Sequence, residues 1–304
     1  MKAAIYTKRS SGKVLELVEI DPPVPKPGEV LIKVRAASIN PLDWRLKSHR
    51  PGVDIAGEVT AVGSRVTRFK SGDAVFGAGK GSFARYAVAR ESRLAPKPDS
   101  VSFEQAASLP IAGLTALQGL RDKGRLAPGQ KVLINGAAGG VGTFAVQIAK
   151  ALGAEVTGVC STRNVEMVRS LGADFVVDYT RQDFTQSTQR YDLVLDNVGN
   201  RTISDLRRVL TPHGRCVLVG APKEMGAVLL HVLEAFARTQ ILRQKVAFFI
   251  AQFKAEDLKT LADFVQTGEI RPVIDRQYSL SEAGDAIAHV EEGHARGKVI
   301  LTTE

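Results

Sequence analysis

The chain carries, near its middle, the segment Val132-Leu133-Ile134-Asn135-Gly136-Ala137-Ala138-Gly139-Gly140-Val141-Gly142. The apolar, β-branched run before Gly136 predicts a strand over residues 131–135. After Gly140, apolar side chains recur three and four residues apart, which predicts an amphipathic helix. These side chains are Val141, Phe144, Ala145, Ile148, Ala149 and Leu152. The segment therefore reads as a strand, a tight glycine turn and a helix.

This layout suits a dinucleotide for three physical reasons. The turn needs backbone angles that glycine tolerates, and a pyrophosphate approaches the backbone closely where no Cβ intrudes. The start of the helix presents free N–H groups and a partial positive charge to the phosphates. Such a glycine pattern also occurs in flexible loops, but the strand before it and the helix after it favour the binding site. The predicted pyrophosphate contacts are Ala138, Gly139, Gly140, Val141 and Gly142.

The end of the next predicted strand indicates which cofactor would bind. Sites that prefer NAD place an acidic residue about 20 residues beyond the glycine turn, where it binds the ribose 2′-hydroxyl. Here Ser161-Thr162-Arg163 occupies that position and contains no acid. Hydroxyl groups and a guanidinium suit a 2′-phosphate, so we expect NADPH to be preferred over NADH. The alternative is that Arg163 is a solvated residue at the start of a helix.

The rest of the chain predicts an α/β protein with two domains. Residues 1–108 contain short strands separated by glycine-rich turns, as in an open β-barrel or sandwich. Residues 109–245 alternate strands with helices, which favours a parallel, doubly wound sheet with right-handed crossovers. Residues 246–304 are too short to fold alone and are expected to complete the first domain, with Ser281 as an N-cap.

Composition excludes several other classes of protein. With 44% hydrophobic and 24% charged residues, the chain is typical of a globular protein. Its net charge of +9 is spread out, and no block of five like charges indicates a nucleic-acid-binding tail. Two cysteines, Cys160 and Cys216, favour a reducing compartment. There is neither a signal peptide nor an apolar run of membrane-spanning length, so we expect a cytoplasmic protein without a membrane partner.

Taken together, the motifs resemble the medium-chain dehydrogenase/reductase superfamily, specifically its zinc-free quinone oxidoreductase-like (zeta-crystallin-like) branch. The similarity runs along the whole chain. Besides the glycine turn, the motifs that carry it are residues 40–43 (Asn-Pro-Leu-Asp), 52–59, 69–77, 107–117, 196–199 and 294–298. The resemblance implies a GroES-like β-domain and a Rossmann domain, with hydride transfer from a nicotinamide in a cleft between them. It also implies a homodimer, for which the apolar residues 227–233 are a candidate contact, although they could equally pack on their own sheet.

The resemblance assigns the remaining cofactor contacts position by position. Thr115 matches the threonine beside the nicotinamide, Ser161 and Arg163 match the 2′-phosphate site, and Tyr179 matches a residue beside the adenosine. Thr115 and Tyr179 could instead be merely packed. The residues implied at strand ends and near the C-terminus are Asn197, Val198, Val219, Gly220 and Lys298.

Chemistry argues against a catalytic zinc, which needs about three ligands from Cys, His or carboxylates. Where zinc-dependent relatives carry a cysteine, this chain has Asn40, and where they carry Gly-His-Glu it has Gly52-Val53-Asp54. Without a Lewis acid, plain alcohol oxidation is disfavoured, and quinones or α,β-unsaturated carbonyls become the expected acceptors. Asn40 could hydrogen-bond a carbonyl oxygen and Asp43 could supply a proton if it is buried. Both could instead stabilise a turn.

The sequence leaves other readings open. Residues 45–51 are short and basic and lack the tyrosine common in relatives, which suggests a wider, more positive entrance for the acceptor or simply a solvated loop. The alternative enzyme is a specific 2-alkenal or enoyl thioester reductase. A different class is a non-catalytic NADPH-binding protein of the crystallin or RNA-binding type. Aromatic residues are only 6% of the chain, which argues against nucleic-acid binding.

Overall fold

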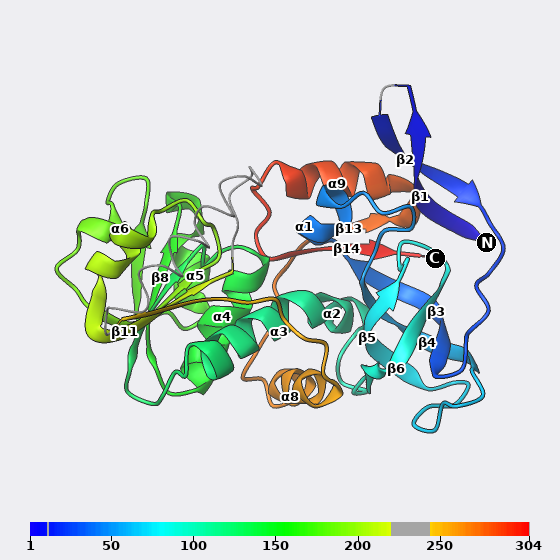
Figure 1. Cartoon of the computed structure of the whole chain (residues 1–304), viewed down its shortest axis with the longest axis horizontal. Coiled ribbons are helices and arrows are strands. Elements are labelled where there is room, and N and C mark those ends of the chain that lie inside the picture. Colours follow the sequence, from blue (N-terminus) through cyan, green and yellow to red (C-terminus); the bar gives the residue numbers. More distant parts are fainter. Residues whose placement is uncertain (11, 220–243, 304) are drawn as a thin grey trace. The chain divides into compact units, whose positions relative to one another are not determined.

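A computed structural model describes residues 1–10, 12–219 and 244–303 (Figure 1). The chain divides into two compact units. Unit 1 comprises Met1–Leu114 with Gln252–Glu304, and unit 2 comprises Thr115–Ala251. Each change of unit lies a few residues beyond the boundary expected from the sequence. Gly220 and residues 227–233, which the sequence singled out, lie outside the described residues.

Unit 2 is a parallel six-stranded sheet with helices between its strands. Its strands are β7 (Lys131–Asn135), β8 (Glu155–Cys160), β9 (Phe175–Asp178), β10 (Tyr191–Asp196), β11 (Leu210–Leu218) and β12 (Lys245–Phe248). Its helices include α4 (Gly140–Ala151), α5 (Val165–Ser170) and α6 (Ile203–Arg208). The strand order β12-β11-β10-β7-β8-β9 reverses direction between β7 and β10. This is the Rossmann order, and ligands of such sheets bind beyond the carboxyl ends of the strands at that reversal.

The sequence explains why unit 2 folds this way. The central strands β7, β8 and β10 are short runs of mostly buried residues, as expected for a sheet covered on both faces, whereas the edge strands β9 and β12 are more exposed. Helix α4 packs on β7 and β8, α5 packs on β8 and β9, and α6 packs on β11. The predicted doubly wound fold is confirmed, and the strand predicted over residues 131–135 is β7.

Unit 1 is built on an antiparallel barrel. Its strands are β1 (Lys2–Arg9), β2 (Gly12–Glu19), β3 (Glu29–Ser38), β4 (Asp54–Val62), β5 (Ala74–Lys80), β6 (Tyr86–Pro96), β13 (Ile274–Ser279) and β14 (Lys298–Thr302). Its helices are α1 (Pro41–Arg45), α2 (Phe103–Ser108), α8 (Ala255–Gln266) and α9 (Ala283–Glu291), while α3 (Pro110–Gln118) crosses into unit 2. Strands β3, β4, β5 and β6 pair in order, and β3 also pairs with β6, so the ladder closes. The barrel is the GroES-like domain expected from the sequence.

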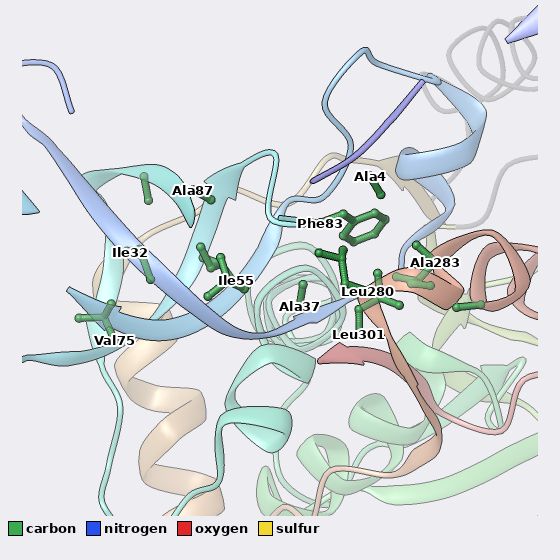
Figure 2. Packing of buried hydrophobic residues seen from close by; sticks show 14 of the residues in the cluster. Ala4, Ile32, Ala37, Ile55, Val75, Phe83, Ala87, Leu280, Ala283 and Leu301 are labelled. Atoms are coloured by element: carbon green, nitrogen blue, oxygen red, sulfur yellow. The ribbon is translucent and has the colours of Figure 1, made fainter. Parts of the chain in front are cut away.

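The C-terminal segment completes the core of unit 1. Strand β14 pairs antiparallel with β3, opposing Leu301 to Ala37. Figure 2 shows Leu280, Ala283 and Leu301 packing near Phe83 and Ala37 from the first hundred residues. Phe83 is 1% exposed. Residues 252–304 therefore contribute apolar surface that the barrel needs, as the sequence predicted.

Unit 1 contains one strand that the sequence did not predict and one helix cap that it predicted at the wrong residue. Strand β1 was not foreseen, although Ala3, Ala4, Ile5 and Tyr6 are all buried and the strand pairs with β2 over its whole length. Ser281 was expected to cap the last helix. Instead, Glu282 is the N-cap of α9 and no side chain caps that helix, while Ser279 caps the short turn over Leu280–Glu282 that precedes it, its N–H and hydroxyl both donating to Glu282 at 2.8 and 2.7 Å. Ser281 lies inside that turn.

Candidate functional site

The glycine turn is shaped by close backbone approach. Gly136 follows β7 with φ +77°, a conformation that residues with a Cβ rarely adopt. A Cβ on Gly142 would lie 2.0 Å from the carbonyl oxygen of Gly136, so only glycine lets α4 begin directly above the end of β7. A Cβ on Gly139 would meet only that carbonyl, at 3.6 Å, and otherwise open space. The turn is therefore closed against β7 at Gly142 and open at Gly139.

The start of α4 has the features of an anion-binding helix N-terminus. Gly139 is the N-cap, and no side chain caps the first turn of this 12-residue helix. The first amides of such a helix carry partial positive charge and need partners. Val141 is half-buried and Ala138 is buried, so small apolar side chains surround these amides. The turn thus fits the pyrophosphate predicted for it.

The predicted 2′-phosphate site follows β8. Ser161 precedes a short helical turn over Thr162–Asn164, and its Oγ accepts a hydrogen bond from Asn164 Nδ2 at 3.1 Å. Arg163 is exposed. Tyr179 lies beside this turn, since its N–H donates to the Cys160 carbonyl at 3.0 Å, and its side chain is 54% exposed. The structure therefore brings these three predicted residues to one place.

Asp178 is a neighbour of this site that sequence reasoning missed. It lies opposite Cys160 in the pairing of β8 with β9. This pairing brings it close to the predicted 2′-phosphate position, although the two are far apart in the sequence. The Thr162 hydroxyl donates to its carboxylate at 2.6 Å, and Thr180 donates both its N–H and its hydroxyl. These hydrogen bonds, that of Thr162 above all, lower the pKa of Asp178. Its negative charge opposes a 2′-phosphate, but these bonds already engage both carboxylate oxygens.

Further predicted residues follow β10 and β11. Asn197 and Val198 come directly after β10, and the Val219 N–H donates to the Asp196 carbonyl at 2.9 Å. Because the strands are parallel, their carboxyl ends share one edge with the glycine turn and the Ser161 turn. Thr115, on α3, is half-buried. The structure thus gathers most of the predicted cofactor contacts on one edge of unit 2.

Unit 1 contains a buried polar network at the other predicted positions. Asn40, Asp43, Asp54 and Lys298 are each at most 3% exposed. The Lys298 ammonium donates to Asn40 Oδ1 at 2.7 Å and to the Ile39 carbonyl at 3.2 Å, and lies 3.7 Å from Asp54 Oδ2. Asn40 Nδ2 donates to Asp54 Oδ2 at 2.8 Å. All of these partners of the Lys298 ammonium belong to unit 1. The predicted contact between Lys298 and a cofactor stays a prediction.

Asp43 connects α1 to the chain at Gly52. Its Oδ2 accepts from the Asn40 N–H at 2.8 Å, which places it in the turn-stabilising role that the sequence left open. Its Oδ1 accepts from the Gly52 N–H at 3.0 Å. Burial is the main cause that raises the pKa of Asp43 to about 7, and the nearby Asp54 raises it further, while the two backbone hydrogen bonds lower it.

The Lys298–Asp54 pair is buried, so its charges are not screened by water. Burial lowers the pKa of Lys298 and raises that of Asp54, and the attraction between the two groups opposes both shifts. Removing one partner of such a pair typically costs about 3–5 kcal/mol, because the other charge is left uncompensated. The pair is thus a structural requirement of unit 1.

The residues at the zinc positions of metal-dependent relatives do not fit a zinc ion. Asp54 supplies a carboxylate, but Asn40 supplies an amide whose oxygen already accepts from the Lys298 ammonium, and Val53 supplies no donor. Zinc sites need about three Cys, His or carboxylate ligands. Across the described ranges, no three such side chains cluster as a metal site. The ammonium also places a positive charge beside Asp54, which repels a cation.

Comparison with known proteins places the chain among oxidoreductases. Residues 26–99 match the alcohol dehydrogenase GroES-like domain, and residues 171–301 match the zinc-binding dehydrogenase family. A chloroplast envelope quinone oxidoreductase homolog of Arabidopsis thaliana is 36% identical, over 99% of this chain and 98% of that protein. An NADPH-dependent alkenal/one oxidoreductase of the same plant is 33% identical, over 99% and 79%. The solved quinone oxidoreductase of Coxiella burnetii is 32% identical, covers 100% and 99% of the two chains, and superposes with a TM-score of 0.86.

Among the residues that the structure describes, no helix has the length and apolar character needed to cross a bilayer.

We predict that Gly139→Ala weakens dinucleotide binding without unfolding unit 2. The φ of Gly139 is −83°, which alanine adopts freely, and the added Cβ would point into the space where phosphate is expected. The dissociation constant for NADPH should rise at least about tenfold, equivalent to about 1.4 kcal/mol. Isothermal titration calorimetry measures the affinity, and the melting temperature should stay near that of the wild type. Gly142→Ala is the contrasting variant, because its Cβ would strike the Gly136 carbonyl and lower the melting temperature.

We also predict that Asp43 makes stability fall as pH rises. With a folded-state pKa of about 7 against an ordinary value of 3.8, the folded protein keeps a proton that the unfolded chain loses. The free energy of unfolding contributed by Asp43 should therefore decrease between about pH 4 and about pH 7. Urea unfolding at several pH values gives the free energy of unfolding of the wild type and of Asp43→Asn. The difference between the two free energies should fall over this pH window.

The charged or titratable groups facing Asp43 are Asp54, Lys298 and Tyr6. A ¹³C carboxyl titration of Asp43 separates its own protonation from theirs. A titration midpoint near the ordinary aspartate value would contradict the prediction.

Proposed function

Because the chain belongs to the medium-chain dehydrogenase/reductase superfamily, in its quinone oxidoreductase-like branch, we propose that it is a zinc-independent, NADPH-dependent reductase of quinones or α,β-unsaturated carbonyls. Its relatives identify it as an NAD(P)H-dependent oxidoreductase of the quinone oxidoreductase or alkenal reductase type. The observation that carries this proposal is the glycine turn at the carboxyl end of β7, which has the backbone geometry that a pyrophosphate requires.

The residues of unit 2 would hold the cofactor along its length. The amides at the start of α4 would bind the pyrophosphate, Ser161 and Arg163 the 2′-phosphate, and Tyr179 the adenosine end. Asn197, Val198 and Val219 would lie beneath the ribose and nicotinamide, with Thr115 beside the ring and Gly220 next in sequence to Val219. When bound, NADPH supplies the hydride. The protein's part would be to hold the nucleotide at the edge of the sheet.

The preference for NADPH rests on charge. No acidic residue occurs at 161–163, where an NAD-specific site would place one, and Arg163 offers a guanidinium for the additional phosphate. Asp178 counts in the opposite direction, but its carboxylate already accepts hydrogen bonds from Thr162 and Thr180. The relative named as an NADPH-dependent alkenal/one oxidoreductase supports the same assignment.

The donor set around Asn40 and Asp54 supports zinc independence. Without a Lewis acid the protein favours acceptors that take hydride readily, which are quinones and conjugated carbonyls. Quinone reduction needs no proton from the protein, because solvent can protonate the hydroquinone oxygens. Reduction of an enone benefits from a positioned acid. Asp43, with a pKa of about 7, is protonated in part of the molecules near neutral pH, which a solvent-exposed aspartate would not be.

Asn40 and Asp43 remain our candidates on the acceptor side, with different roles. The Asn40 amide already donates to Asp54 and accepts from Lys298. We therefore propose that Asn40 and Lys298 position the backbone around residue 40 and act on the acceptor through it. Asp43 is the candidate proton donor. We also retain the homodimer and the cytosolic location as proposals.

The leading alternative is a reductase specific for 2-alkenals or enoyl thioesters. Steady oxidation of NADPH in the presence of a simple quinone supports the quinone reading, whereas reduction of an enone with no quinone turnover supports the alternative. Saturable binding of NADPH with neither reaction would leave only a nucleotide-binding protein. Zinc near one atom per chain by elemental analysis would contradict zinc independence.

We predict that Arg163→Ala removes most of the preference for NADPH. Loss of a charge-assisted contact to the 2′-phosphate should raise KM for NADPH about tenfold and leave KM for NADH nearly unchanged. Arg169→Ala is the matched control, because Arg169 on the nearby helix α5 pairs with Glu166 at 2.8 Å. Steady-state kinetics with both coenzymes measures the ratio. An unchanged ratio in Arg163→Ala would refute the assignment.

A further inference from the structure

Asp196 is a fully buried carboxylate to which the proposed function assigns no role. It is the last residue of β10, and its exposed fraction is 0%. Asn197 and Val198, both candidate cofactor contacts, follow it directly. Strand β10 lies next to β7, whose end forms the glycine turn. A buried acidic side chain is costly unless its hydrogen bonds offset the loss of water, so its partners indicate what it does.

One oxygen of Asp196 shapes the turn that follows β10. Asp196 Oδ1 accepts hydrogen bonds from the N–H groups of Val198 and Gly199, both at 3.1 Å. It also accepts from Asn135 Nδ2 at 2.8 Å. Two of these donors lie in the β10 turn and the third lies at the end of β7. A single atom therefore fixes one turn and connects it to the neighbouring strand.

Asn197 makes a second connection between the β10 turn and the end of β7. The N–H and the Nδ2 of Asn197 donate to the Asn135 carbonyl at 3.2 and 3.1 Å. Asn135 immediately precedes Gly136, where a Cβ would lie 2.7 Å from Val198 Cγ2. The β10 turn thus packs directly on the first residue of the glycine turn. Movement of one turn would displace the other.

Two acceptors at this place have no partner among the residues that the structure describes. They are Asp196 Oδ2 and Asn197 Oδ1, both buried. Buried polar atoms are nearly always hydrogen-bonded to protein, water or ligand. These two oxygens lie at the edge of the sheet where the ribose of a dinucleotide is expected. A sugar hydroxyl or an ordered water could donate a hydrogen bond to them there.

On the premise that unit 2 binds a dinucleotide, we propose that Asp196 is a positioning residue for the cofactor. Through Asn135 and the amides of Val198 and Gly199, it holds the β10 turn against the glycine turn. Both turns then meet the nucleotide with their contacts already in place. Preorganisation of this kind raises affinity, because the cost of ordering the site is met during folding. The function of Asp196 is therefore to support binding without itself contacting the reacting atoms.

The chain offers a matched control on the same two strands. Asp192, near the start of β10, accepts from the Lys131 N–H of β7 at 2.9 Å and from the Thr211 hydroxyl at 3.4 Å. It therefore connects β10 to β7 as Asp196 does, but at the opposite end of the strands. Asp192→Ala and Asp196→Ala both remove an aspartate that links these strands. Only Asp196→Ala also releases the turns at the proposed binding edge.

The experiment measures NADPH affinity by fluorescence titration, melting temperature, and steady-state kinetics for wild type and three variants. Asp196→Ala should raise the dissociation constant for NADPH at least about tenfold, as expected for loss of a buried network. Its KM for NADPH should rise more than its kcat falls. Asp192→Ala should lower the melting temperature but keep the wild-type dissociation constant. Asp196→Asn keeps an acceptor oxygen at the same place and should restore affinity to within about threefold.

The outcomes separate two kinds of failure. If the wild type does not bind NADPH, the proposed function fails. If the wild type binds and Asp196→Ala binds equally well, the positioning role of Asp196 fails while the function stands. A role in stability alone would also overturn the proposal. It would appear as equal losses of affinity in Asp192→Ala and Asp196→Ala that follow their melting temperatures.

Discussion

The close approach of α4 to the end of β7 is the constraint on which the structure of unit 2 depends. Gly142 lies so near the Gly136 carbonyl that any Cβ would collide with it at 2.0 Å. This contact sets where α4 begins, and so aims its first amides beyond the carboxyl edge of the sheet. The turns after β8 and β10 then add their side chains around the same edge.

Unit 1 buries ionisable side chains that hydrogen-bond to one another. The ammonium of Lys298, the carboxylates of Asp54 and Asp43, and the amide of Asn40 form one hydrogen-bonded group in the barrel. Burying an ion pair typically gains little net stability, yet breaking it is costly. The group therefore defines a single arrangement for the start of α1 and for β14.

The elements whose structure depends on local sequence patterns could be predicted from the sequence. The glycine turn, the strand over residues 131–135 and the amphipathic helix after Gly140 follow from periodicity and turn chemistry alone, and the structure contains them as β7, the turn and α4. What could not be foreseen depends on pairing between distant segments. Asp178 reaches the Ser161 turn only because β8 and β9 are neighbours, and Lys298 reaches Asn40 only because β14 pairs with β3.

The same limit applies to individual roles. Asn40 and Asp43 were recognised as site candidates, but sequence could not show that Asn40 is committed to Lys298 and Asp54. Asp196 stood within a recognised motif, and its three donors became visible only in the fold. Burial and partners, which determine whether a polar residue binds a ligand or supports one, are properties of the folded chain.

The most direct measurement is a titration of the ¹⁵N-labelled protein with NADP⁺ followed by amide chemical shifts. The account predicts saturable shifts at Gly139, Gly140, Val141 and Gly142 that are among the largest in the spectrum, with one binding isotherm. Unchanged amides at these four residues in the presence of excess coenzyme would contradict it.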